Sequence, residues 1–199
     1  MNAESGLRER TRRAVQREIG EAALALFLER GYDATTIDDI AAAAGMSQRS
    51  VFRYFATKED IVVGKMDATV PLMLQTLRTR PPDEPVWASL RHLFFMLDEP
   101  GRPQTAEATH RILLETPALF AAYLRKLHLM QEAVVQVLRE RATATGTPYA
   151  DDDPAPRAIT AAAFGCLVAA QHSWLASGAT GTLGDAIDRA MATVAPRDT

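Results

Sequence analysis

A short segment in the first third of the chain is crowded with side chains that can bond to nucleic acids. Residues 47–58 read SQRSVFRYFATK and carry Arg49, Arg53 and Lys58 without any acidic residue. An arginine can bond O6 and N7 of guanine together, and a glutamine can bond N6 and N7 of adenine. Serine, tyrosine and lysine commonly bond phosphates. The segment is therefore chemically suited to touch DNA.

Helical spacing separates this segment into two faces. With 3.6 residues per turn, Val51 and Phe55 share an inner, apolar face. The opposite face then presents Gln48, Arg49, Phe52 and Arg53. An exposed phenylalanine gains nothing from water, whereas an aromatic edge can meet the methyl group of thymine. The alternatives are a helix that docks to another protein and a core helix whose faces are assigned wrongly.

The preceding residues predict the elements that hold this segment. A capping-box pattern at Thr36–Asp39 starts a helix over residues 37–44, and Gly45 ends it. Ser47 then caps a further helix over residues 48–55. Two short helices joined through a glycine are typical of a helix-turn-helix, whose second helix enters the DNA major groove.

The remaining sequence also predicts helices, and no run of residues alternates as a strand would. Further helices are expected over residues 8–30, 57–80, 86–98, 104–115, 117–143, 156–177 and 183–195. We therefore predict an all-α fold of about nine helices. A three-helix helix-turn-helix domain is expected over residues 1–57, and a larger helical domain for ligand binding and dimerisation over residues 58–199.

Composition excludes several classes of protein. The 199 residues include one cysteine, Cys166, so no internal disulfide can form and a reducing cytoplasm is expected. The first 20 residues have no apolar core like that of a signal peptide. An uncharged run over residues 158–182 is long enough to span a bilayer, but it consists largely of small and polar residues. We predict a buried helix there and no membrane partner.

The distribution of charge fits a protein that meets phosphates on one surface only. The net charge is -3, which argues against indiscriminate coating of nucleic acid. Residues 8–17 nevertheless hold five arginines against a single glutamate, and residues 47–58 form a second basic island. The alternative for the first island is a solvated, charged helix face.

The segment from residue 26 to residue 62 resembles the DNA-binding region of the tetracycline-repressor (TetR) family. The matching features are Phe27, Gly31-Tyr32, Thr35-Thr36, Ile40-Ala41, Ala44-Gly45, Ser47, the FRYF sequence at residues 52–55, and Lys58-Glu59. The resemblance implies an all-helical, dimeric transcription factor that is usually a repressor released from double-stranded DNA by a small ligand.

The same resemblance implies which residues occupy DNA-contacting positions. They are Thr36, Ser47, Gln48, Arg49, Ser50, Phe52, Tyr54 and Lys58. Helical spacing, rather than the family, adds Arg53. Phe52 departs from the family, in which many members carry a tyrosine there. Without the hydroxyl a phosphate bond is lost, so we expect an apolar contact to a base.

A helical sensor domain needs an apolar cavity with a few polar groups to orient its ligand. Our candidates for a small, largely apolar effector are Met66, Met73, Phe95, His110, Leu114, Tyr123, Phe164, Gln171 and Trp174. For each residue taken singly, ordinary core packing is the alternative.

The small residues of the helix over residues 156–177 predict a homodimer interface. Close helix approach would use Ala161, Ala162, Gly165 and Ala169, and the last helix would add Ile187 and Met191. Two DNA-binding helices about 34–36 Å apart would then meet a palindromic operator.

Other classes of function fit the sequence less well. Cys166 and His172 lie six positions apart on one helix and so face different directions. Neither a glycine-rich phosphate loop nor a hydrolase motif is present. The four histidines are scattered, so we predict no catalytic residue, no metal site and no cofactor. A ligand-independent protein-binding module with the same fold remains the alternative.

Overall fold

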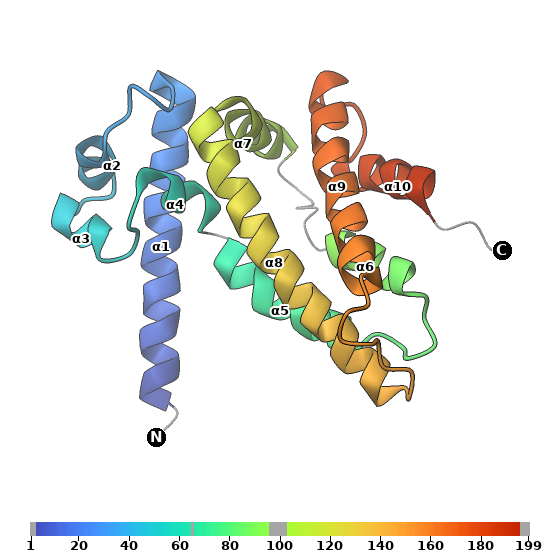
Figure 1. The fold of residues 1–199 in the computed structure, drawn as a ribbon. Coiled ribbons are helices and arrows are strands. Elements are labelled where there is room, and N and C mark those ends of the chain that lie inside the picture. The colour runs from blue at the N-terminus through green and yellow to red at the C-terminus, as the bar shows by residue number, and fades with distance from the viewer. Residues whose placement is uncertain (1–2, 65, 96–102, 196–199) are drawn as a thin grey trace. The chain divides into compact units, whose positions relative to one another are not determined.

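The computed structural model describes residues 3–64, 66–95 and 103–195 (Figure 1). Over these residues the chain forms ten helices and no strand, which confirms the all-α prediction. The chain divides into two compact units. The first unit combines residues up to Thr69 with Arg111–Leu124, and the second combines Val70–His110 with residues from Arg125 onward.

The first unit is organised around one long helix. The helices that belong wholly to this unit are α1 (Ala3–Arg30), α2 (Ile37–Ala43), α3 (Gln48–Phe52) and α4 (Lys58–Val63). Helix α1 packs against α2 and α4, and α2 packs against α3. The buried side chains that join them are Ile19, Ala23, Leu26, Phe27, Tyr32, Ile40, Ala41, Val51, Phe55, Ile61 and Leu119.

This unit extends past residue 57, where the sequence suggested a domain boundary. Ile61 and Val63 of α4 are 3% and 2% exposed, and Ile61 belongs to the core beneath α1. Leu119, from much later in the chain, is fully buried in the same core. Helix α4 is therefore part of the unit that holds the helix-turn-helix.

The predicted single helix over residues 57–80 is wrong, because two helices occupy it. Helix α4 ends with Gly64 as its C-cap, and α5 runs from Met66 to Arg78. A Cβ atom on Gly64 would meet the Asp60 carbonyl oxygen and would lie 2.9 Å from Cε1 of Phe55. The absent side chain therefore lets the end of α4 approach the Phe55 ring closely.

The second unit contains the C-terminal helices. Helices α6 (Val86–Phe95), α9 (Ala155–Ala176) and α10 (Leu183–Val194) pack against one another. Helices α5, α7 (Pro103–Glu115) and α8 (Pro117–Ala144) each contribute residues to both units.

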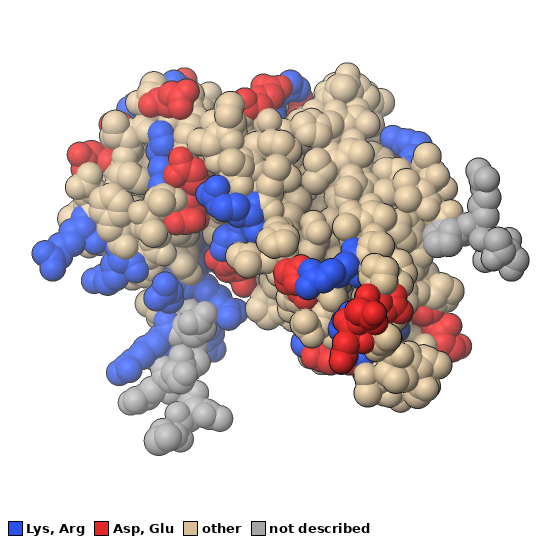
Figure 2. All heavy atoms as spheres, in the orientation of Figure 1, with Lys and Arg blue, Asp and Glu red and all other residues tan. Residues whose placement is uncertain are grey.

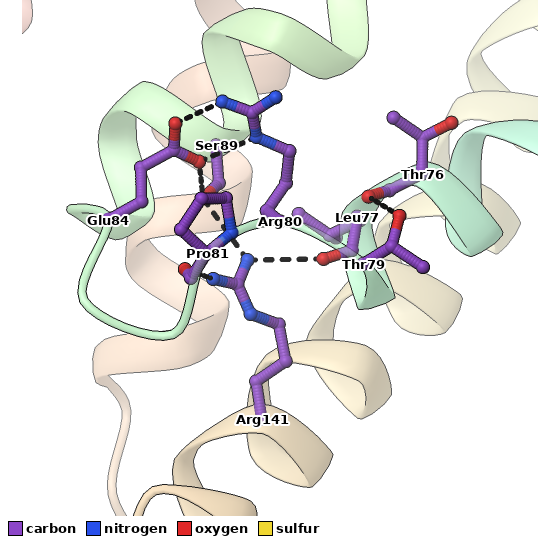
Figure 3. Close-up of polar contacts among 8 residues, drawn as sticks. All are labelled: Thr76, Leu77, Thr79, Arg80, Pro81, Glu84, Ser89 and Arg141. Carbon is purple, nitrogen blue, oxygen red and sulfur yellow. Dashed lines mark hydrogen bonds and ion pairs between the residues drawn. The ribbon is translucent and has the colours of Figure 1, made fainter.

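An arginine from α8, Arg141, forms hydrogen bonds with the end of α5, with the segment that follows it and with α6 (Figure 3). Arg141 donates to the backbone oxygens of Leu77 and Pro81 over 3.2 and 2.8 Å. Its guanidinium also donates to the buried Ser89 hydroxyl over 3.1 Å. Arg141 thus bonds one carbonyl group in the last turn of α5, that of Leu77, and one in the segment that follows the helix, that of Pro81.

Glu84 completes this polar cluster. It pairs with Arg80, and the Ser89 hydroxyl donates to its carboxylate over 2.6 Å (Figure 3). These hydrogen bonds, that from Arg80 first, lower the pKa of Glu84 to about 2. The cluster therefore holds a charged carboxylate at neutral pH.

Among the described residues, α9 is the one helix long and apolar enough to cross a membrane. Half of its most apolar window is buried inside the structure. Phe164, Leu167 and Trp174 are at most 5% exposed. A largely buried core helix passes the same test of length and composition.

Candidate nucleic-acid interface

The first helix of the helix-turn-helix begins with the predicted capping box. The Thr36 hydroxyl accepts a hydrogen bond from the Asp39 amide over 3.2 Å, and the Thr36 amide donates to the Asp39 carboxylate over 2.8 Å. A further bond from the Thr36 hydroxyl helps lower the pKa of Asp39. This cap fixes where α2 starts.

The turn between α2 and α3 requires a glycine. Gly45 has φ +65°, a left-handed conformation that other L-residues rarely adopt. Its amide donates to Ala42 over 3.1 Å, and the next amide, of Met46, donates to Ala41 over 2.9 Å. This pair of bonds is a Schellman motif, which closes α2 and redirects the chain into α3.

The two predicted faces of α3 are confirmed. Val51 is fully buried and Phe55, beyond the helix end, is 7% exposed, so both lie in the core of the first unit. The outer side chains, which are exposed, are Gln48, Arg49, Phe52 and Arg53. Phe52 is 49% exposed, so its ring is open to a partner.

The hydroxyl groups of Ser47, Ser50 and Tyr54 lie beside this outer face. Ser47 caps α3 by accepting from the Ser50 amide over 3.2 Å, and the two hydroxyls lie 3.0 Å apart. Arg53 lies 5.2 Å from the centroid of the Tyr54 ring. These groups can bond phosphates beside the bases that α3 would meet. Figure 2 shows basic side chains gathered on this flank of the first unit.

Lys58 has a role within the subunit that its position in the sequence does not indicate. Its ammonium group donates to the backbone oxygens of Tyr32 and Thr35 over 2.8 and 3.0 Å. The same nitrogen lies 3.9 Å from the centroid of the Tyr32 ring. Two of its three N–H groups are thus directed to the loop between α1 and α2. Lys58 fastens that loop to the start of α4.

Tyr32 also contacts Glu59, the residue that follows Lys58. Its hydroxyl donates to Glu59 over 2.6 Å. Burial and the nearby carboxylate raise the pKa of Tyr32 well above its usual range. Partial burial alone would raise the pKa of Glu59, but hydrogen bonds, chiefly from Tyr32, lower it overall. Tyr32, Lys58 and Glu59 therefore form one polar cluster between the start of α4 and the loop that precedes Thr36.

The residues predicted for an effector pocket divide between the two units. Met66, Leu114 and Tyr123 belong to the first unit, and Met66 is only half-buried. The second unit contains Met73, His110, Phe164, Gln171 and Trp174. The side chain of Phe95 lies outside the described residues. The predicted effector pocket stays a prediction.

Two aromatic contacts involve residues of the second group. The His110 and Trp174 rings meet edge-on with centroids 5.6 Å apart, and Phe94 meets Phe164 at 5.1 Å. Gln171 is buried in the same unit. A surface depression of about 170 Å³ between α9 and α10 is lined by none of the residues predicted for the effector pocket, and it is smaller than typical ligand pockets.

A buried hydroxyl in α9 was missed by the sequence reasoning. Thr160 is fully buried, and within the described part of the chain its Oγ1 has no hydrogen-bond partner. Nothing in the sequence distinguishes Thr160 from a threonine that bonds to its own helix. An unpaired buried polar group costs about 1–3 kcal/mol.

The residues predicted for a dimer interface also divide into two groups. Ala161, Gly165 and Ala169 are exposed on α9, and Ala162 is partly exposed. By contrast, Ile187 and Met191 of α10 are 3% and 1% exposed. Other residues of the same chain bury these two side chains, and their place at a dimer interface stays a prediction.

The structure separates the two residues considered for catalysis. Cys166 is buried, its Sγ atom lies 3.5 Å from the Ala190 oxygen, and burial raises its pKa. His172 is exposed on the same helix. In the described ranges, no three histidine, cysteine or acidic side chains form a group that could hold a metal ion.

Family models match most of the chain. Residues 19–63 match "Bacterial regulatory proteins, tetR family", and residues 84–198 match the "MftR C-terminal domain". The TcmR transcriptional regulator of Streptomyces glaucescens is 32% identical, over 78% of this chain and 71% of its own. The putative mycofactocin biosynthesis regulator MftR of Mycobacterium tuberculosis is 25% identical, over 83% and 82% of the two chains.

Solved structures show the same fold. SmeT in complex with triclosan is 21% identical, with a TM-score of 0.58 over 90% of this chain and 91% of its own. Thermus thermophilus FadR in complex with lauroyl-CoA is 20% identical, with a TM-score of 0.54 over 92% and 97%. The curated relatives are transcriptional regulators rather than enzymes. With its helix-turn-helix and its match along most of its length, the chain belongs to the TetR family of transcriptional regulators.

Proposed function

We propose that this regulator is a homodimeric repressor that binds a palindromic operator and is released by a small, largely apolar effector. The observation that carries the proposal is the outer face of α3. There Gln48, Arg49, Phe52 and Arg53 are exposed together on a helix whose other face lies in the core. Each good bidentate contact to a base would discriminate by about 1–3 kcal/mol. The expected compartment is the cytoplasm.

The dimer is supported by the small residues of α9. Ala161, Gly165 and Ala169 are exposed at four-residue spacing, so they line one side of the helix. Two copies of such a face can approach closely about a two-fold axis. The same symmetry would give the two α3 helices a palindromic site.

The apolar effector is supported by two structural neighbours and by the second unit. SmeT was solved with triclosan and FadR with lauroyl-CoA. Triclosan is largely apolar, and lauroyl-CoA carries an apolar acyl chain on a charged carrier. In this chain the rings of Phe164 and Trp174 are buried in the second unit, with His110 and Gln171 as polar groups. An effector would release DNA if it favours a conformation that binds DNA less well.

Selection of bound duplexes from a random DNA library tests the proposal. The wild-type protein is expected to enrich a two-fold symmetric site, and Arg49→Ala is expected to lose preference at one position of each half-site. Arg125→Ala is the control, since this arginine is exposed and lies in the second unit. If the wild type enriches no sequence, the helix-turn-helix would have to serve another partner, such as a protein.

A further inference from the structure

Helix α1 extends well beyond the core of the first unit. The first side chain that packs against the core is Val15, and the first fully buried one is Ile19. Every described side chain over residues 7–14 is exposed. At about 1.5 Å per residue, the helix runs roughly 18 Å from Ala3 before it meets the core. Packing within the subunit does not explain this extension.

The extension carries the most concentrated positive charge in the sequence. Residues 8–17, here called the basic segment, hold five arginines against one glutamate in a chain of net charge -3. Arg10, Arg13 and Arg17 share one side of the helix, and Arg8 and Arg12 share the opposite side. The positive charge therefore surrounds the helix.

This arrangement favours DNA over a membrane surface. A helix that lies on a membrane needs a broad apolar face. Between Arg8 and Arg17 the apolar residues are Ala14 and Val15, and Val15 is already committed to the core. All five basic residues are arginines, whose planar fork matches the oxygens of a phosphate. The basic segment thus has the chemistry of a phosphate-binding surface.

The basic segment lies on the same unit as α3. Figure 2 shows basic side chains over the N-terminal half of α1 and beside it over α3, whereas acidic side chains gather nearer the other end of α1. Arg49 and Arg53 of α3 are exposed. One duplex could therefore meet both elements of this unit.

We propose that the basic segment binds phosphates that flank the base pairs met by α3. The inference rests on the proposed DNA-binding function and adds a second contact from the same subunit. From Arg8 to Arg17 the helix spans about 14 Å, which corresponds to roughly four base pairs. Phosphate contacts carry no sequence information, so the segment adds affinity to all duplexes alike.

The test is a triple substitution of exposed arginines, Arg10, Arg12 and Arg17 to glutamine, in the full-length protein. Arg13 is left unchanged because it interacts within the chain. Affinity for the selected operator and for a scrambled duplex is measured from 50 to 300 mM salt. Each lost phosphate contact makes the negative slope of log affinity against log salt shallower by about 0.9. The three substitutions should therefore reduce its magnitude by about 2–3 per subunit. At 0.1 M salt, we expect both affinities to fall at least about tenfold.

Two variants control for charge and for folding. Replacing the second unit's Arg78, Arg91 and Arg125 by glutamine removes the same charge and should leave the slope within about 0.5 of wild type. Replacing Arg10, Arg12 and Arg17 by lysine should restore most of the slope, because the charges remain. Circular dichroism checks that all variants stay folded.

The outcomes separate this inference from the proposed function. An unchanged slope in the glutamine variant, with wild-type operator selection intact, would overturn the inference alone. Equal losses in both glutamine variants would also overturn it, since the effect would then reflect net charge. If the wild type selects no operator, the proposed function itself fails. Binding to anionic vesicles is measured alongside. If the glutamine variant of the basic segment loses binding to the vesicles but to neither duplex, the segment would be assigned to a membrane instead.

Discussion

Replacing Lys58 by methionine tests whether this residue fastens the loop between α1 and α2. Methionine keeps much of the apolar stem but removes the ammonium group that donates to Tyr32 and Thr35. Hydrogen bonds to a charged group contribute about 1.5–3 kcal/mol each, and an exposed cation–π contact contributes about 0.5–1 kcal/mol. Because Lys58 is only half-buried, water can replace part of these interactions. We expect a net loss of about 2–3 kcal/mol in the free energy of unfolding of the first unit.

Urea denaturation followed by circular dichroism measures this loss. Arg49→Met is the matched control, since it removes an exposed positive charge from the same unit and should change stability by less than about 0.5 kcal/mol. The sequence placed Lys58 at a DNA-contacting position, where a lysine commonly bonds phosphate. Wild-type stability in Lys58→Met, together with a reduced salt dependence of DNA binding, would refute the fastening role and restore that earlier interpretation.

Three further predictions concern stability. Gly64→Ala should destabilise the protein by about 1–3 kcal/mol in urea denaturation, because its Cβ would meet the Asp60 carbonyl oxygen and the Phe55 ring. Gly20→Ala has no such close contact and should stabilise the protein by about 0.5–1 kcal/mol. Equal effects of the two substitutions would contradict the packing argument. Thr160→Val should raise the melting temperature, since it removes a buried hydroxyl without a described partner, and a lower melting temperature would indicate a missed bond. For Glu84, the folded pKa of about 2 lies below the ordinary value of 4.5, so its contribution is complete above pH 4.5 and is lost as the pH falls toward 2. The difference in unfolding free energy between wild type and Glu84→Gln should therefore shrink over that range, and a constant difference would exclude this linkage.

The helix-turn-helix could be predicted from sequence because local signals determine it. The cap at Thr36, the left-handed Gly45 and the cap at Ser47 act over four or five residues, so their positions in the sequence fix where α2 and α3 begin and end. The outer face of α3 follows from the spacing of Val51 and Phe55 alone.

Features that depend on distant contacts could not be predicted in this way. The need for a glycine at position 64 depends on the close approach of the Phe55 ring, and the role of Lys58 depends on backbone oxygens more than 20 positions earlier. Similarly, the spacing of Ile187 and Met191 shows that α10 has an apolar face but not what covers it. In the structure, other residues of the same chain bury that face.

The small size of α3 has a consequence for the genetics of this regulator. A helix of five residues has no stability of its own in water, so its shape exists only while the surrounding core is intact. That core includes Leu119, which follows α3 by more than 60 positions and is fully buried. Truncating such a residue typically costs about 2–5 kcal/mol and would leave fewer molecules competent to bind, lowering apparent affinity by the same fraction. Mutations that abolish regulation are therefore expected at positions that touch neither DNA nor effector.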